Sequence, residues 1–264
     1  MTGAVLAATF EPPSTGDFVY GCWGPAVKIF GFTFCFNFIT FLVLLGMAMF
    51  MAFFFFALRK PTLVPGKLQS LAEVGIAFVR ENIALTMIGP AAAEGFMPLL
   101  CTLFFAILFW NIFEIAPLIN FSSNSRLVFP LIMALTAWVV FNTVGIKKHG
   151  FVGYTKHVLF PPGVPGWLKA PMAVIEFITK IIIRPITLTV RLWANFLAGH
   201  FLLAVFFLGT IAMLQGGLLV IAAPFAFAFS VVLVGFEIFV SLLQAFIFAI
   251  LTASYIGEAL AEEH

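Results

Sequence analysis

The sequence "PMAVIEFITKIIIRPITLTVRLWANFLAGHFLLAVFFLGTIAML", residues 171–214, decides the fold class because it is apolar over almost its whole length. As a single helix it would be about 66 Å long, whereas the hydrocarbon core of a bilayer is about 30 Å thick. A second segment of this kind, 218–256, follows "QGG" at 215–217. Each segment is either two spans with an unrecognised turn or one steeply tilted helix. Residues 192–257 contain no Lys or Arg and few turn residues, which favours a tilted helical hairpin.

The overall composition indicates an integral membrane protein. Of the 264 residues, 63% are hydrophobic and only 9% are charged. Long apolar runs without alternating ten-residue segments favour spanning helices over a barrel, so we predict an all-α fold. The net charge of +2 is too small for a nucleic-acid surface, and we expect membrane lipid as the surrounding partner. Cys22, Cys35 and Cys101 lie far apart, and their spacing supports neither a disulfide framework nor a metal site.

The basic residues beside the apolar runs predict the topology. Arg59, Lys60 and Lys67 follow the first run, so the N-terminus is expected outside and the C-terminus in the cytoplasm. The first residues have no basic n-region, so we expect no cleaved signal peptide. We predict one membrane domain of about five spans, with these parts: an outside segment 1–33, a span 34–58, a cytoplasmic amphipathic segment 61–95, spans 96–119 and 127–146, a basic cytoplasmic loop 147–170, the hairpin 171–214 and 218–256, and a tail 257–264.

Polar residues in the hairpin fall on defined helix faces. At about 100° per residue, one stripe of the first segment carries six of them: Glu176, Lys180, Arg184, Thr187, Arg191 and Asn195. Ser230, Glu237, Ser241 and Gln244 share one face of the second segment. A charge at bilayer depth costs at least a few kcal/mol, so these faces are expected to meet a partner or a cavity and not lipid.

Counting residues from the turn places Arg191 level with Gln244, and His200 roughly level with Glu237. An imidazole near a carboxylate can pass protons on near physiological pH. Arg191 cannot release its proton and must act as a fixed positive charge, which favours the ionised form of a nearby carboxylate and repels leaking protons. Only Glu176, about four turns away, offers a carboxylate on that face, so we predict an acidic partner subunit.

The motifs "RPITLTVRLWANFLAGH" at 184–200 and "EIFVSLLQAFIFAILTASYI" at 237–256 resemble the subunit a family of F-type ATP synthases. The resemblance implies a non-catalytic stator subunit that forms two proton half-channels against the rotating c-ring and couples proton flow to ATP synthesis. It also implies a peripheral-stalk b-type subunit as a partner, no cofactor, and a place in the bacterial plasma membrane.

The resemblance also implies roles for single residues. Arg191 resembles the family's essential arginine, which faces the ring carboxylates, and Asn195 and Gln244 match polar residues beside it. His200 and Glu237 match the pair that lines the outer half-channel, with acid and imidazole exchanged relative to some members.

Other matches concern the two ends of the proton path. In "WNIFEIAP", Asn111 and Glu114 resemble the outer entrance, although Ile119 stands where some members carry a second acid. A looser match assigns four residues to the inner half-channel: Glu176, Lys180, Thr187 and Ser241.

Structural alternatives exist for each of these assignments. Arg191 could snorkel to the interface, Lys180 and Arg184 could anchor to headgroups, and Glu114 could be an interfacial acid. His200 and Glu237 could form a purely structural hydrogen bond. At the level of the whole chain, the alternatives are an assembly subunit without transport and a self-contained secondary transporter or ion channel, which usually shows internal repeats that we do not find. A His/Glu relay favours protons over sodium.

Overall fold

The structure is a computed structural model that describes residues 27–29, 32–34, 36–115, 127–160, 168–215 and 220–261. Its elements in chain order are β1 (Val27–Ile29), β2 (Phe32–Phe34), α1 (Phe38–Leu58), α2 (Lys67–Val79), the π-helical η2 (Arg80–Ala84), α3 (Leu85–Met87), α4 (Ala93–Ile115), α5 (Val128–Leu159), α6 (Lys169–Phe177), the π-helical η5 (Ile178–Ile183), α7 (Arg184–Gln215) and α8 (Ala223–Leu260). Within these ranges five helices are long and apolar enough to cross a membrane. The predicted helical membrane fold is confirmed, with a short antiparallel pair of strands before α1.

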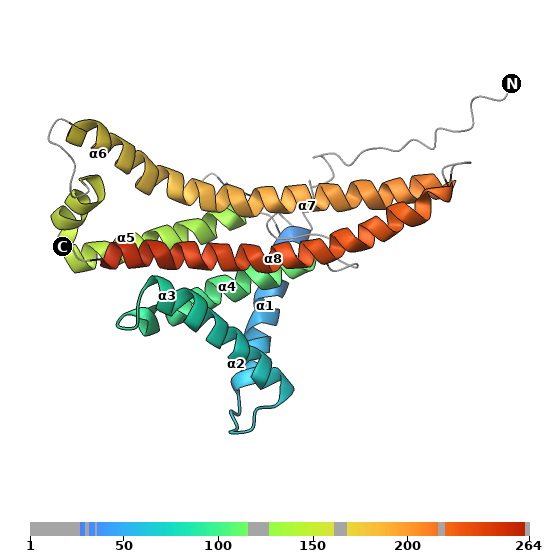
Figure 1. Cartoon of the computed structure of the whole chain (residues 1–264), viewed down its shortest axis with the longest axis horizontal. Coiled ribbons are helices and arrows are strands. Elements are labelled where there is room, and N and C mark those ends of the chain that lie inside the picture. The colour runs from blue at the N-terminus through green and yellow to red at the C-terminus, as the bar shows by residue number, and fades with distance from the viewer. Residues whose placement is uncertain are drawn as a thin grey trace.

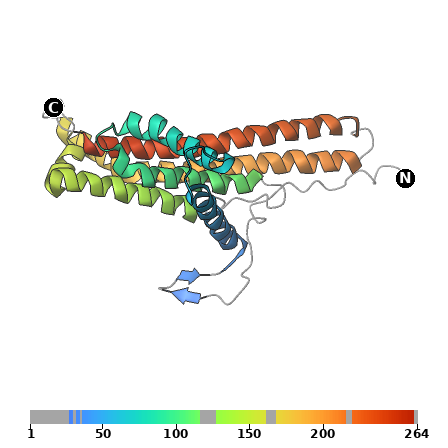
Figure 2. The ribbon, with the colours of Figure 1, turned by 90° about the horizontal axis from the view of Figure 1, so that it is seen from below.

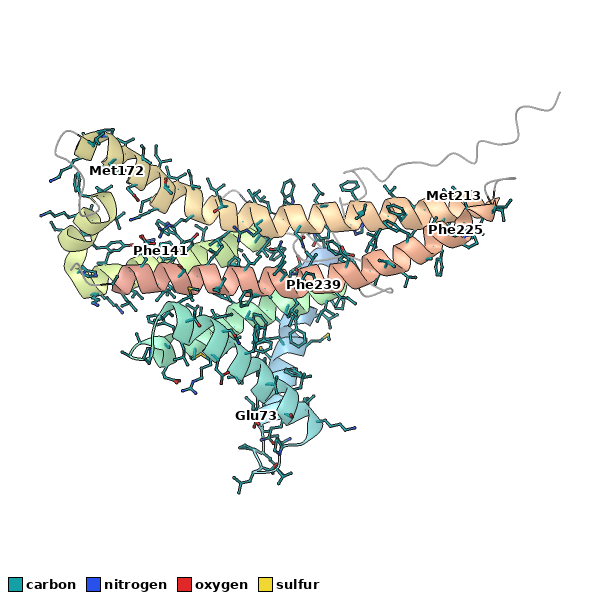
Figure 3. The ribbon with its side chains drawn as sticks, viewed as in Figure 1. Glu73, Phe141, Met172, Met213, Phe225 and Phe239 are labelled. Carbon is teal, nitrogen blue, oxygen red and sulfur yellow. The ribbon has the colours of Figure 1, made fainter. Side chains whose placement is uncertain are left out.

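The two longest helical segments form the predicted hairpin. Residues Lys169–Leu214 form a continuous helical segment of 46 residues, and α8 has 38. At 1.5 Å per residue both are far longer than a bilayer core is thick. Figure 1 shows α7 and α8 side by side, and Met213 and Phe225 lie at their closed end (Figure 3). In both ribbon views α1 crosses the direction of the hairpin (Figures 1 and 2).

Helix α8 is the packing centre of the bundle, because it contacts α4, α5 and α7. Its buried stripe includes Ala245, Ala249 and Ala253, which are fully shielded. Small side chains allow helix backbones to approach closely, which replaces the missing hydrophobic driving force in lipid. At Gly257 the approach is closest, since a Cβ there would stand 2.2 Å from the Met87 carbonyl oxygen.

Aromatic side chains join α1 to α4. The rings of Phe54 and Phe105 meet edge to face with centroids 4.8 Å apart, and Phe50 packs on Phe109 at 6.2 Å. The other side of α1 exposes large apolar side chains such as Phe56, which is 65% exposed. A helix that is apolar all round fits a membrane environment.

The sequence predicted a basic loop at 147–170, but helix α5 instead continues to Leu159. Gly150, with φ 72° and ψ 163°, interrupts the helical backbone for one residue, after which the helix resumes. The resumed part packs back onto α5, where the Tyr154 hydroxyl donates to Asn142 Oδ1 at 3.0 Å. Similarly, α8 runs to Leu260, so residues 257–260 of the predicted tail are helical.

The segment between α1 and α4 is a loop followed by the short helices α2, η2 and α3. One side buries Ala72, Val79 and Ile83, while Leu71 and Val74 on α2 are exposed. This amphipathic segment packs against α1, α4 and α8. Its position at the cytoplasmic membrane surface stays a prediction.

Candidate functional site

Several polar residues of the hairpin are buried or half-buried in the bundle. Glu237 and Ser241, one turn apart on α8, are 6% and 2% exposed. Arg191, Asn195, His200 and Gln244 are half-buried. The apolar remainder of both helices explains this arrangement, because polar groups in a membrane avoid lipid by facing other helices.

A cavity of about 120 Å³ lies between the two long helices and brings Asn195 of α7 and Glu237 of α8 to the same space. Its remaining wall is small or apolar and consists of Ala198, Gly199, Leu202, Leu203, Leu233, Phe236 and Val240. A buried water needs only about 10–15 Å³ of such space, together with polar partners. The cavity therefore has room for several waters beside a buried carboxyl group and an amide.

His200 directly follows a wall residue of this cavity. Its ring stacks on that of Phe196 one turn earlier, with centroids 5.6 Å apart and an interplanar angle of 23°. The imidazole is therefore half-buried and held against an aromatic ring. The predicted pairing of His200 with Glu237 stays a prediction.

Arg191 differs from the other cations of its stripe. Among the residues that the structure describes, it makes no hydrogen bond and no ion pair. Its neighbours Leu188 and Leu192 are buried, whereas Val190 is exposed. Glu176, the carboxylate expected on the same stripe, instead bonds Lys180 with Nζ–Oε2 at 3.3 Å.

Gln244 and Ser241 add unpaired polar atoms on α8. In the described part of the chain, neither Gln244 Oε1 nor the Ser241 hydroxyl has a hydrogen-bond partner, although both atoms are buried. A buried polar atom without a partner costs roughly 1–3 kcal/mol, so such atoms are usually retained for a role or satisfied by water.

The expected outer entrance is described only in part. Asn111 on α4 is 3% exposed, as expected for a polar residue that faces the bundle interior. The side chain of Glu114 lies outside the described part of the structure, as do Ile119, Cys22 and Cys35. The described cysteine, Cys101, is a free thiol.

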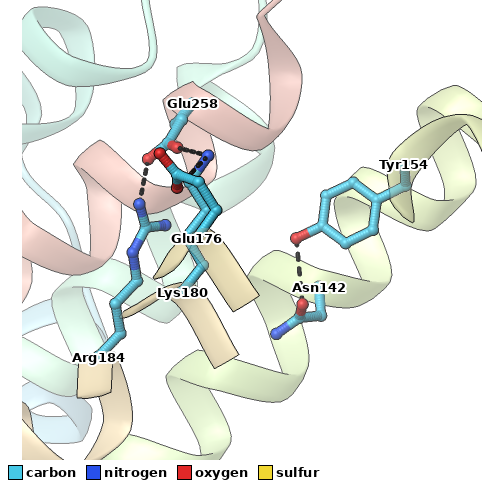
Figure 4. Close-up of polar contacts among 6 residues, drawn as sticks. All are labelled: Asn142, Tyr154, Glu176, Lys180, Arg184 and Glu258. Atoms are coloured by element: carbon cyan, nitrogen blue, oxygen red, sulfur yellow. Dashed lines mark hydrogen bonds and ion pairs between the residues drawn. The ribbon is translucent and has the colours of Figure 1, made fainter. Parts of the chain in front are cut away.

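A second polar cluster lies at the open end of the hairpin, and the sequence analysis missed its central residue, Glu258 (Figure 4). Its carboxylate contacts Lys180 Nζ at 3.1 Å and accepts a hydrogen bond from Arg184 at 2.7 Å. The Arg184 guanidinium also lies over the Tyr255 ring, 4.3 Å from its centroid. Lys180 and Arg184 are therefore held by partners within the chain, with side chains only 16% exposed.

The signal for Glu258 was present in the residue count from the turn. Glu258 stands 43 residues after Gln215, and Glu176 stands 39 residues before it, so the same count would have placed the two at similar depth. Thr187, the other residue assigned to this region, is exposed, and its hydroxyl donates to the Arg184 carbonyl at 3.0 Å.

Comparison with known proteins adds evidence that is independent of this geometry. A family model described as ATP synthase A chain matches residues 38–257. The chain is 41% identical over 263 residues to an ATP synthase subunit a from Rhodococcus erythropolis, covering 98% of this chain and 94% of that protein. It is 39% identical over 264 residues to the subunit a from Nocardioides sp., with 97% and 95% covered. The subunit a from Streptomyces lividans is 39% identical over 223 residues, with 84% and 79% covered.

Proposed function

Because this chain belongs to the ATP synthase A chain family, we propose that it is the non-catalytic stator subunit that forms two proton half-channels against a rotating c-ring. Its relatives are bacterial proteins, and its helices make it a multi-pass protein of the bacterial inner membrane. The finer assignment depends on one observation. Arg191 is a charge on a membrane helix, and the described residues offer it no counter-ion.

A permanently charged guanidinium without an internal carboxylate requires an external one, since burying a lone charge is costly. The carboxylates of a c-ring that pass Arg191 would supply it. Each would be held ionised while it faces the arginine and would take up a proton after moving past it. The same positive charge would prevent protons from leaking directly between the two half-channels.

The outer half-channel would use the cavity between α7 and α8. A buried carboxyl at Glu237 can accept and release a proton, and Asn195 can orient water between it and the ring. His200, Glu114 and Asn111 would complete the path toward the outside. Gln244 would lie beside Arg191, and its unpaired oxygen could accept a hydrogen bond from a ring carboxyl or from water.

The inner half-channel would lie toward the open end of the hairpin. Glu176, Lys180, Thr187 and Ser241 are its expected residues, with the C-terminus in the cytoplasm and the N-terminus outside. A peripheral-stalk b-type subunit would hold this stator in place. One charge crossing 100 mV yields about 2.3 kcal/mol, so several protons per turn must be coupled to drive ATP synthesis.

Replacement of Arg191 tests the proposal in membranes that carry the whole complex. Arg191→Gln should abolish ATP-driven proton pumping while the amount of assembled complex is unchanged. Arg59→Gln is the matched control, since Arg59 is exposed after the end of α1 and its charge lies over the Phe55 ring. Unchanged pumping by Arg191→Gln would overturn the proposal. A self-contained transporter would instead move ions when the chain is reconstituted alone.

A further inference from the structure

The charged cluster at the open end of the hairpin is electrically balanced. Glu176 and Glu258 carry two formal negative charges, and Lys180 and Arg184 carry two positive ones. Lys180 bonds both carboxylates, and Arg184 bonds Glu258. The side chains of Lys180 and Arg184 are largely shielded, so their charges are poorly screened by solvent and the balance matters.

Arg184 and Arg191 share one face of α7. They are seven residues apart in a regular α-helix, which is two turns and about 10 Å along the axis. A proton path that leads from Arg191 toward this end of the hairpin must pass Arg184. Without Glu258, Arg184 would be a second uncompensated cation on that path.

The cluster also connects three parts of the chain. A small space of about 10 Å³ is surrounded by Lys180, Arg184, Glu258 and Tyr255, together with Asn142 and Tyr154 of α5. Tyr154, whose hydroxyl donates to Asn142, and Asn142 itself lie to one side of the ion pairs (Figure 4). Lys148 Nζ donates to the Leu260 carbonyl at 2.5 Å, which ties α5 to the end of α8.

We propose that Glu258 is a positioning residue for proton translocation, because it neutralises Lys180 and Arg184 and thereby leaves Arg191 as the uncompensated charge of the α7 stripe. This inference rests on the proposed function. The ion pairs keep the inner end of the path neutral, so that protons can approach the hairpin from that side. Arg191 alone then sets the electrostatic barrier between the two half-channels.

A pair of variants separates this electrostatic role from a purely structural clamp. Glu258→Gln leaves one excess cation. Proton pumping and ATP synthesis by the whole complex should then fall about tenfold, because that is the effect of one unit charge near 10 Å from the path at an effective dielectric constant of about 20. Adding Arg184→Gln to Glu258→Gln removes the excess cation without restoring an ion pair. The double variant should recover most of the lost rate.

The outcomes are read with the amount of assembled complex measured in parallel. Recovery in the double variant supports the inference. A double variant as slow as Glu258→Gln, or slower, overturns the inference in favour of a structural clamp. Normal pumping by Glu258→Gln alone also overturns the inference. If Glu258→Gln fails to assemble but the double variant assembles and pumps, the excess charge is again the cause. Normal pumping by Arg191→Gln would instead defeat the proposed function, so the two failures are distinguishable.

Discussion

Asn195 on α7 and Glu237 on α8 line one cavity of about 120 Å³ between the two long helices. Helix angles, counted separately on the two segments, did not place Asn195 and Glu237 together. They grouped Asn195 with Arg191, and the count from the turn paired Glu237 with His200. The shared cavity connects the expected ring-facing stripe with the expected outer path. It gives a continuous, water-sized space in which a proton could move between them.

The buried carboxyl of Glu237 should be needed for proton flow. Glu237→Gln keeps the shape of the side chain but cannot exchange a proton, so ATP-driven pumping should fall by about 10²-fold or more, the scale of general acid–base effects. Fluorescence quenching in inverted membrane vesicles would measure it. Glu73→Gln, a change at an exposed residue of α2, should pump normally. Equal rates in the two variants would exclude Glu237 from the path.

Filling the cavity should block the path without changing any charge. Val240 lines the space, and Val240→Phe would occupy part of the volume available to water. Pumping and ATP synthesis should both fall while the complex still assembles, since overpacking costs only about 1–3 kcal/mol. Val231→Phe is the matched control, because Val231 is 54% exposed on the same helix. If both variants pump alike, the cavity carries no protons.

The close approach of α8 to α3 should require a glycine. In Gly257→Ala the new methyl carbon would stand 2.2 Å from the Met87 carbonyl oxygen, and a backbone atom cannot move aside cheaply. We expect a loss of about 1–3 kcal/mol, seen as faster heat inactivation of the solubilised complex. Gly235→Ala in the same helix has open space around it and should be as stable as the parent.

The break in α5 should likewise depend on its glycine. Gly150 has φ 72° and ψ 163°, a region of backbone conformation open essentially to glycine alone, in which another residue costs about 1–3 kcal/mol. Gly150→Ala should therefore loosen the packing of Tyr154 on Asn142 and expose this region to limited proteolysis. Gly153→Ala, whose Cβ would meet His149 Cβ at an ordinary 3.6 Å, should be cleaved no faster than the parent.

Hydropathy and helix periodicity were sufficient to predict the five long helices and the hairpin. They could not predict how the helices meet. Glu258 was missed because its partners lie on another helix, and angles within one helix say nothing about such contacts. The loop expected at 147–170 was inferred from its glycines and lysines, whereas one glycine was enough to redirect a chain that otherwise stays helical.

The π-helical segment η5, Ile178–Ile183, explains a further limit of helix arithmetic. A π-bulge accommodates an additional residue within a helix, so angles counted at 100° per residue lose their phase across it. Lys180 lies inside this segment, and Arg184 begins the regular helix after it. The angles of Glu176 and Lys180 relative to Arg191 and Asn195 therefore do not follow from a count of 100° per residue.

The change of helical phase at η5 also sets how α6 is rotated about the helix axis relative to α7. Deleting a single apolar residue from η5 would remove no ionisable group, yet it would rotate α6, which carries Glu176, by about a quarter turn relative to α7. The length of η5 thus sets the direction of Glu176 relative to Arg191.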